Sequence, residues 1–559
     1  GYSVGDALTV SQAQLTGASS DLVITLTAAN LDLEGNFSMA AGAFDPGTSD
    51  LHNVAGNWNE TGGVFQPTDG TFTFSGTGGK TIFQNTGNNF FDLTIASGGT
   101  DKISANSPIS VGGVFTNTNG TFDTEVNTVE VTGATNIDGG ILEIAAGTFD
   151  ANGDFDANGA FVTFTGNGTL KLGGNAGSTP DLGTLNDNAG LGNISMGTVI
   201  YDNQGGSQTI YDANDQGTGY FNLIIDKNLQ TATYQDGDPF VILGDLTITT
   251  GNLTLDNSNP LTLSGNFTMD AGSFDPGTNT QHTISGNWNE NGGIFQPVDG
   301  TINFQGDGIT DRTSTITTIS TNNFYNLNIS YNSVPFNLIC QAQTKITVNN
   351  LLTISDTDTL DMAGNDGSAG AVMFTGTLKM TTGEFTNTGS TTFGGGLTFG
   401  TLSIGTGTYN AVGQFSAGTD GQGEVIFTGD GNLICSSTSN NTFGTLTDDL
   451  GTVTFDATLG PQVLPEETFN NLTVNNASNL TMSTDVTVNG DLDFTSGNVV
   501  TNDNVLTIGE DGTISNATDA SHVNVSNDDG YLSKIFGSAL SFSFPVGNGF
   551  ILRPIDLTT

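Results

Sequence analysis

The chain has 559 residues, of which 57 are Asp or Glu and 9 are Lys or Arg, so its formal net charge at neutral pH is −48. This charge excludes a nucleic-acid binder, because phosphate neutralisation needs clustered Lys and Arg. Hydrophobic residues make up 35% of the chain, enough for a folded core, but no run approaches the roughly 20 apolar residues of a membrane span. We therefore expect a soluble or secreted protein with no membrane insertion.

The first residues of the sequence do not have the pattern of a targeting segment. Residues 1–4 read Gly-Tyr-Ser-Val, without the basic region or the apolar region of a secretion signal. We expect any such signal to have been removed already or to lie outside this sequence.

A long segment near the N-terminus occurs twice. Residues 31–76 recur as residues 261–306 at a constant offset of 230. The pentapeptide Gly-Asn-Trp-Asn-Glu, for example, stands at 56–60 and again at 286–290. The sequence therefore predicts that both segments fold in the same way.

A shorter unit of about 20 residues repeats within each copy. Gly-Asn-Phe at 35–37 precedes Phe-Asp-Pro at 44–46, and Gly-Asn-Trp at 56–58 precedes Phe-Gln-Pro at 65–67, which is 21 residues later. Apolar residues alternate with Thr at 71–74, the period-2 pattern of a strand with one buried face. Short strands at this spacing favour the coils of a parallel β-solenoid. A string of antiparallel β-sandwiches is the alternative.

In the solenoid interpretation the aromatic residues of the first copy face the core. The expected inward residues are Phe37, Phe44, Trp58, Phe65, Phe72 and Phe74. Two further motifs recur at unequal spacing. Phe-x-Gly-x-Gly stands at 74–78, 164–168, 304–308 and 427–431, and Asp/Asn-Leu-x-aliphatic stands at 92–95, 222–225, 326–329 and 471–474. No window shows a helical apolar stripe, so we expect almost no helix.

An Asp-rich run at 150–159 has the spacing of a calcium loop in its first half. The candidate ligands are Asp150, Asp154, Asp156 and Asn158. The twelfth position of such a loop requires a bidentate Glu but is Thr165 here, and no flanking helices are expected. The run is therefore interpreted as a polar solenoid turn and no cofactor is expected, with calcium binding as the alternative.

The two cysteines allow two interpretations. Cys340 and Cys435 each end the tetrapeptide Asn-Leu-Ile-Cys in strand-like surroundings. They form a disulfide if an oxidising compartment and the fold bring them together. Otherwise they are small buried apolar residues at equivalent positions of two repeats.

The histidines and tryptophans are interpreted as core residues. His52, His282 and His522 each stand alone among Thr and Asn, whereas a zinc site needs three or four converging ligands. Trp58 and Trp288 replace the Phe of a Gly-Asn-Phe unit. We therefore expect both indoles inside the core rather than on a sugar-stacking surface.

The charged residues give no catalytic motif. The nine basic side chains are scattered without a local motif that pairs them with acids, at Lys80, Lys102, Lys171, Lys227, Arg312, Lys345, Lys379, Lys534 and Arg553. We predict that the chain is not an enzyme. A polysaccharide-degrading β-helix, in which distant carboxylates meet in a groove, is the less favoured alternative.

The C-terminal tail carries the most specific resemblance to known proteins. Gly-Tyr-Leu-Ser-Lys at 530–534, Phe-Ser-Phe-Pro-Val-Gly-Asn-Gly at 542–549 and Arg-Pro-Ile at 553–555 follow an Asn-Gly-Asp-Leu-Asp-Phe element at 489–494. With them the sequence resembles the giant β-strand-repeat surface proteins of Bacteroidota and related bacteria. The resemblance implies an extracellular, structural or adhesive protein with no catalytic residues. It also implies further domains after the tail, such as immunoglobulin-like and type IX secretion sorting domains.

These observations give one combined prediction. Residues 1–230 and 231–525 form two large repeats of a parallel β-solenoid, and residues 526–559 begin an antiparallel β module. The protein is a subunit or stalk segment of a bacterial surface filament or surface layer, without catalysis. Its partners are other copies joined head to tail or further domains of a longer chain. A glycan-binding adhesin stalk is the alternative function.

Overall fold

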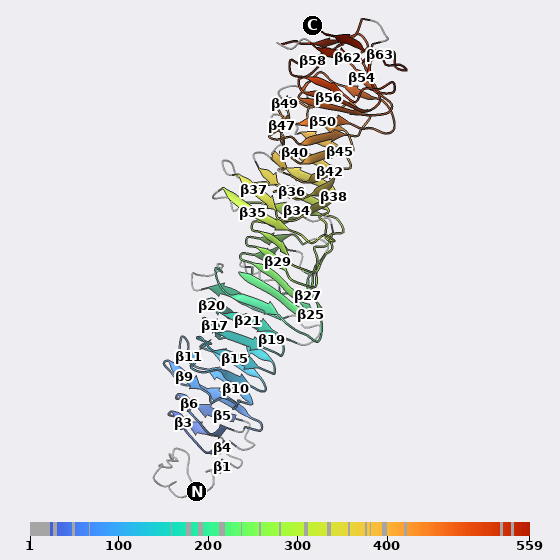
Figure 1. Cartoon of the computed structure of the whole chain (residues 1–559). Helices are drawn as coiled ribbons and strands as arrows, with labels where there is room; N and C mark the ends of the chain where they lie inside the picture. Colours follow the sequence, from blue (N-terminus) through green and yellow to red (C-terminus); the bar gives the residue numbers. More distant parts are fainter. Residues whose placement is uncertain are drawn as a thin grey trace. The chain divides into compact units, whose positions relative to one another are not determined.

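The computed structural model shows an all-β chain (Figure 1). It describes residues 23–25, 31–46, 51–65, 67–157, 159–174, 180–187, 194–211, 219–235, 238–256, 259–278, 281–306, 311–331, 337–355, 358–374, 377–380, 382–393, 400–418, 422–525, 529–537 and 541–558. Over these residues there is no helix, and parallel strands stack as a β-solenoid of about 22 turns with a spacing of roughly 21 residues. The predicted solenoid is confirmed, and the alternative of tandem antiparallel sandwiches is wrong.

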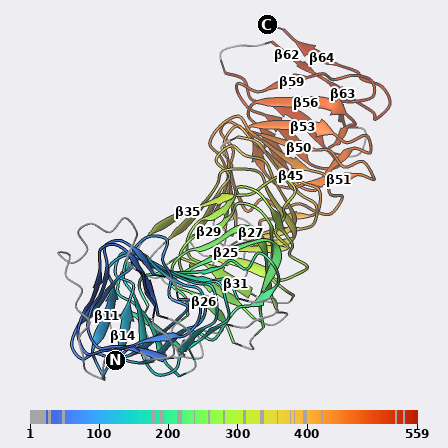
Figure 2. The same cartoon turned by 90° about the horizontal axis from the view of Figure 1, so that it is seen from below.

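The chain divides into two compact units, Gly1–Asn259 and Pro260–Thr559. The domain boundaries expected at 230 and 525 stay predictions. In Figure 2 the coils of the first unit, in blue and teal, are seen nearly end-on and superimposed.

Parallel sheets run through the first unit, and most successive strands of the chain belong to different sheets. One sheet is formed by β2 (Asp32–Leu33), β5 (Leu51–Val54), β8 (Thr71–Phe74), β10 (Asp92–Ala96), β13 (Phe115–Asn119), β16 (Thr135–Ile137) and β19 (Phe155–Asp156). The next is formed by β3 (Phe37–Met39), β6 (Trp58–Glu60), β9 (Lys80–Phe83), β11 (Lys102–Ala105), β14 (Thr121–Asp123), β17 (Ile141–Ile144), β20 (Phe161–Phe164) and β22 (Thr184–Asp187). A third contains β12 (Ile109–Val111), β15 (Thr128–Val131), β18 (Thr148–Ala151), β21 (Thr169–Leu172), β23 (Thr198–Tyr201), β24 (Gln208–Thr209), β25 (Asn222–Tyr234) and β27 (Leu246–Leu255), while β4 (Ala43–Asp45) and β7 (Val64–Phe65) pair separately.

The second unit is built in the same way. One face is formed by β28 (Leu261–Leu263), β31 (Gln281–Ile284), β34 (Thr301–Phe304), β36 (Asn326–Ile329), β38 (Ile346–Ile354), β40 (Gly367–Phe374), β42 (Glu384–Asn387), β45 (Thr408–Ala411), β48 (Asn432–Cys435), β50 (Thr452–Phe455), β53 (Asn471–Asn475), β56 (Asp491–Ser496) and β59 (Thr513–Ser515). Another face contains β29 (Phe267–Met269), β30 (Ser273–Asp275), β32 (Trp288–Glu290), β33 (Ile294–Phe295), β35 (Arg312–Thr317), β37 (Leu338–Ala342), β39 (Thr359–Asp361), β41 (Thr377–Met380), β44 (Thr401–Ile404), β47 (Glu424–Phe427) and β49 (Thr445–Thr447).

The core consists of inward side chains that stack from coil to coil. In β8 the rings of Phe72 and Phe74 are fully buried between outward Thr side chains. Of the aromatic residues expected inside, Phe44, Trp58 and Phe65 are also buried, and Phe37 is half-buried. Alternation of Phe with Thr therefore predicts correctly which face of the strand is inside.

The two sequence copies fold in the same register. Phe37 of β3 pairs with Trp58 of β6, and Phe267 of β29 pairs with Trp288 of β32. The ring centroids within these pairs are 3.9 Å and 4.2 Å apart. The 21-residue spacing read from the sequence is thus the length of one coil.

The Gly-Asn dipeptide of each copy joins consecutive coils. The Asn36 side-chain carbonyl accepts the backbone N–H of Asn57 at 2.8 Å, and in the second copy Asn266 accepts that of Asn287 at 2.9 Å. A side chain at Gly56 would place its Cβ 2.2 Å from the backbone oxygen of the preceding coil. Glycine is required there because the coils approach so closely.

The C-terminal segment contains both parallel and antiparallel pairs. The parallel stack includes β58 (Val505–Ile508) with β61 (Tyr531–Lys534), and β60 (Val523–Asn524) with β63 (Val546–Gly547). The strands β62 (Phe542–Phe544) and β64 (Ile555–Leu557) pair antiparallel. The antiparallel element expected in the tail is therefore present, next to strands that continue the solenoid. No helix in the described part of the chain is long and apolar enough to cross a membrane.

Candidate functional site

Of the four candidate calcium ligands, the structure describes Asp150, Asp154 and Asp156. Asp150, in β18, places its carboxylate 3.1 Å from the Lys171 ammonium. Asp154 lies in the turn before β19 and Asp156 lies within β19, whereas Asn158 is outside the described residues. Over the ranges that the structure describes, no group of three or more His, Cys, Asp or Glu side chains could hold a metal ion. Calcium binding by this run stays a prediction.

The cysteines are buried apolar residues. Cys340 lies in β37 and Cys435 in β48, and both thiols are free and fully buried. Burial raises the pKa of both thiols well above the ordinary range. Of the two interpretations left open by the sequence, the disulfide is wrong.

The duplicated histidines are core residues. The Nδ1 atoms of His52 and His282 accept the backbone N–H groups of Leu31 and Leu261, each at 3.1 Å. Both rings are buried, and burial lowers the pKa of His282 to about 4. His282 is therefore neutral at physiological pH, and each ring ties its coil to the preceding one.

Both tryptophans are buried, and each indole forms a hydrogen bond with a Glu carboxylate. The sequence analysis did not identify these two Glu residues as candidate site residues. The Trp58 indole N–H donates to Glu60 Oε1 at 2.5 Å, and the Trp288 indole donates to Glu290 Oε1 at 2.8 Å. The other oxygen accepts the Nδ2–H of an Asn in the next coil, from Asn88 to Glu60 at 2.7 Å and from Asn322 to Glu290 at 2.9 Å.

We call Trp58, Glu60 and Asn88, and likewise Trp288, Glu290 and Asn322, the Trp–Glu–Asn clusters. The second carboxylate oxygen also accepts a backbone N–H, from Asn85 in the first cluster and from Ile319 in the second, each at 3.1 Å. Burial raises the pKa of both Glu residues, against the opposing effect of these hydrogen bonds. Each cluster crosslinks two coils, and donors occupy both carboxylate oxygens, so it is suited to structure rather than to proton transfer.

The scattered lysines are brought to acids by the stacking of coils. Lys102 lies 2.8 Å from Asp123 and 2.9 Å from Glu143. Lys171 lies between Asp150 and Asp202, at 3.1 Å and 3.0 Å. The partners are distant in sequence, which is why no local motif indicates these ion pairs.

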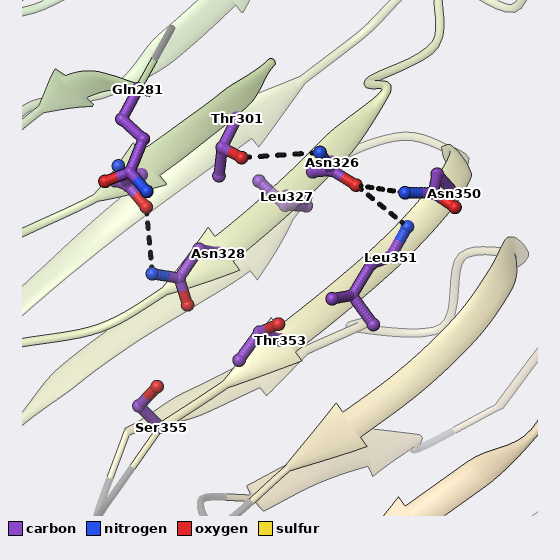
Figure 3. Close-up of a pocket in the computed structure, with 10 residues that line it drawn as sticks. Gln281, Thr301, Asn326, Leu327, Asn328, Asn350, Leu351, Thr353 and Ser355 are labelled. Atoms are coloured by element: carbon purple, nitrogen blue, oxygen red, sulfur yellow. Dashed lines mark hydrogen bonds between the residues drawn. The ribbon is translucent and has the colours of Figure 1, made fainter. Parts of the chain in front are cut away.

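The described surface is hollowed by a groove over β31, β34, β36 and β38 (Figure 3). Its volume is about 340 Å³. Its lining consists of uncharged side chains, namely Gln281, Thr301, Asn303, Asn326, Leu327, Asn328, Asn350, Leu351, Thr353 and Ser355. In a chain with a net charge of −48, this groove presents amides and hydroxyls instead of carboxylates. The sequence did not predict it.

Hydrogen bonds between coils orient the amides of the groove. The Asn326 side-chain oxygen accepts the Asn350 Nδ2–H at 2.8 Å and the Leu351 N–H at 3.2 Å. Asn328 Nδ2 donates to Asn303 Oδ1 at 2.8 Å. Asn328 Oδ1 has no hydrogen-bond partner within the described residues, although it is shielded from solvent. The amides of the groove are therefore held in fixed orientations by hydrogen bonds between coils.

Asn326 also explains a motif found in the sequence. Asn326 is the first residue of the Asp/Asn-Leu-x-aliphatic unit in β36. The first residue of each of the other units also accepts a backbone N–H from the following coil. Asp92, Asn222 and Asn471 accept the backbone N–H of Val114, Asp245 and Asp491 at 2.6, 2.9 and 2.9 Å. The motif thus supplies one side-chain acceptor for the following coil.

Comparisons with known proteins give no relative of this chain. No family model, no curated protein and no solved structure matches it.

Proposed function

We propose that the chain is a structural component of a bacterial exterior, a subunit or stalk segment of a surface filament or surface layer, and that it has no catalysis of its own. The observation that carries the proposal is the repeated tie between coils within each unit. Backbone pairing is supplemented by the Gly-Asn dipeptides, by the Asp/Asn of the recurring motif and by the Trp–Glu–Asn clusters. Extracellular location rests on the resemblance of the tail.

The dense ties between coils suit a body that bears load. Strands in one parallel sheet lie about 4.8 Å apart, so each coil is held to the next by backbone hydrogen bonds on several faces. Repeat proteins gain stability from such nearest-neighbour interfaces rather than from one unique core. The buried carboxylates Glu60 and Glu290 belong to these interfaces, because every donor that they accept comes from their own coil or the next.

Self-association is the second part of the proposal. The C-terminal antiparallel element exposes apolar side chains, with Phe550 84%, Ile551 49% and Ile555 62% exposed. Exposed apolar surface of this kind is typical of an interaction site. A second copy joined head to tail, or a further domain of a longer chain, would cover it.

Electron microscopy of the purified chain tests the proposal. We expect end-to-end particles, promoted by calcium or mild acid because both reduce repulsion between bodies of high negative charge. Phe550→Asp combined with Ile555→Asp should abolish the end contacts. Leu459→Asp, at a residue 94% exposed elsewhere, is the control and should leave them intact.

Two results would contradict the proposal. One is a chain that stays monomeric at every calcium concentration and at every pH between about 7 and 4. The other is turnover of a polysaccharide that is lost when a surface carboxylate is replaced. Proteolysis of intact cells of the source organism tests the location, because an exterior protein is cleaved without lysis.

A further inference from the structure

We propose that the groove over β31, β34, β36 and β38 binds a segment of a neutral polysaccharide that runs along the stacking direction. This site goes beyond the structural role, since a spacer needs no groove. The ligand class follows from the chemistry of the lining, the spacing of the coils and the contrast with the first sequence copy.

The lining matches sugar hydroxyl groups. Amide side chains offer both donors and acceptors, and the hydroxyls of Thr301, Thr353 and Ser355 offer either. A neutral sugar presents the same mixture. An anionic polysaccharide or a nucleic acid would meet a chain of net charge −48 without a basic side chain in the groove, so repulsion opposes both.

The spacing of the polar groups fits a linear chain of sugars. Gln281, Thr301 and Asn326 occupy one column, because each is paired in register with the next. The Asn326 side chain then reaches the following coil, where its oxygen accepts the Leu351 N–H at 3.2 Å. Columns on a parallel sheet advance by about 4.8 Å per strand. A chain of linked pyranose rings advances by a similar distance per residue, so each coil can contact one sugar.

A second column supplies amide and hydroxyl groups and an apolar surface. It runs from Asn303 through Asn328 and Thr353 to Met373. Asn328 lines the groove, and its Nδ2 is held in place by a hydrogen bond to Asn303 Oδ1 at 2.8 Å. Met373 is 42% exposed and offers its thioether to the apolar face of a ring.

The corresponding positions of the first unit lack the amides of the groove. The residues that pair there in the same way are Leu51, Thr71 and Asp92 in one column, and Thr73 and Thr94 in the other. Leu51 is 59% exposed, and Asp92 replaces Asn326 by a carboxylate. The chain therefore contains its own control surface.

Affinity electrophoresis of the full chain tests the proposal. The probes are soluble neutral polymers, namely hydroxyethyl cellulose, arabinoxylan and galactomannan, with polygalacturonate as the anionic comparison. We expect retardation by at least one neutral polymer and none by polygalacturonate. Asn328→Thr, which installs the residue of the first copy, and Thr353→Val should each weaken binding about 3- to 10-fold, as expected for one lost hydrogen bond. The control Thr94→Val should not.

Circular dichroism and the melting temperature of each variant separate lost binding from lost folding. If Asn328→Thr unfolds the chain, Thr353→Val still decides, because Val keeps the shape of Thr and favours a strand. The proposal is overturned if no neutral polymer binds, if polygalacturonate binds equally well, or if folded variants bind as the original chain does. None of these results changes the outcome of the filament test, which uses different residues.

Discussion

The two sequence copies share their interior but differ on their outer faces. Trp58, Glu60 and Asn88 in the first unit have the same hydrogen bonds as Trp288, Glu290 and Asn322 in the second. His52 and His282 likewise make the same contact. The inward residues and the ties between coils are thus what this fold requires.

The outward positions carry the differences. Leu51 and Asp92 of the first unit stand where the second has Gln281 and Asn326. Asp92 and Asn326 nevertheless make the same contact between coils, because the side-chain oxygen of each accepts a backbone N–H from the next coil. A solenoid can therefore change its outer surface without altering its coils, and the surface that differs is where a specific function is most readily added.

Truncation of equivalent core rings should have the largest effect. Phe74 and Phe304 are both fully buried, and we expect Phe74→Ala and Phe304→Ala each to lower the free energy of unfolding of its unit by about 3–5 kcal/mol. Urea unfolding followed by circular dichroism measures this. Leu51→Ala, at an exposed residue, is the control and should change it by less than about 0.5 kcal/mol. If only one of the two substitutions lowers the free energy of unfolding, the interiors of the two copies are not equivalent.

The second largest effect is expected at Lys227, a buried lysine of the first unit where the second unit has an asparagine. Lys227 donates to Gln208 at 2.7 Å inside the first unit, as Asn476 donates to Gln462 at 3.0 Å inside the second. Burial lowers the pKa of Lys227 to about 8. Between pH 8 and 10.5 the unfolded state therefore binds more protons, so stability rises with pH by up to about 1.4 kcal/mol per pH unit. Below pH 8 this contribution is constant and least favourable.

Exchange of the two residues tests this difference. Lys227→Asn should remove the rise in urea midpoint between pH 8 and 9.5, and Asn476→Lys should create one while destabilising the second unit near pH 7. Comparison with the original chain at each pH cancels the other titrating groups. If the urea midpoint rises equally with pH in Lys227→Asn and in the original chain, the pKa of Lys227 is not lowered.

The Trp–Glu–Asn clusters should respond alike in both units. In Glu60→Gln and Glu290→Gln an amide N–H faces the N–H groups that the carboxylate oxygen accepts. Each substitution should lower the free energy of unfolding by about 1–3 kcal/mol near pH 7. Because burial raises the pKa of the native Glu, the folded state takes up its proton first as pH falls. The stability of the original chain relative to the variant therefore increases as pH falls from the raised pKa towards 4.5. Thermal melts at several pH values measure this, with the exposed Glu34→Gln as control.

Sequence reasoning could predict the fold because its signals are local. The alternation at Thr71–Phe74 and the 21-residue spacing of Phe37 and Trp58 need only neighbouring residues and one period. Glu60 could have been noticed, since it repeats two residues after each Trp. Its partner Asn88 could not, because that contact depends on the packing of the following coil.

The groove and the ion pairs depend on register over several coils. Asn326 is equivalent to Asp92 at an offset of 234 rather than 230, so an insertion shifts the alignment that the sequence copies suggest. Lys171 meets Asp150 at the regular spacing of 21 residues, whereas its contact with Asp202 depends on an insertion between them. The calcium interpretation of residues 150–159 rests on their spacing along the chain. The structure instead pairs Asp150 with Lys171 of the next coil.

The smallest expected effect concerns the side-chain acceptor that both units keep. Asp92 accepts the Val114 N–H at 2.6 Å, whereas Asn222, Asn326 and Asn471 perform the same task with an amide oxygen. Asp92→Asn should therefore change the free energy of unfolding by less than about 0.5 kcal/mol. Asp92→Ala leaves the N–H of the next coil without its acceptor and should cost about 1–2 kcal/mol. Urea unfolding of the two variants side by side decides, and equal losses would mean that the charge of Asp92, rather than its hydrogen bond, holds the coils together.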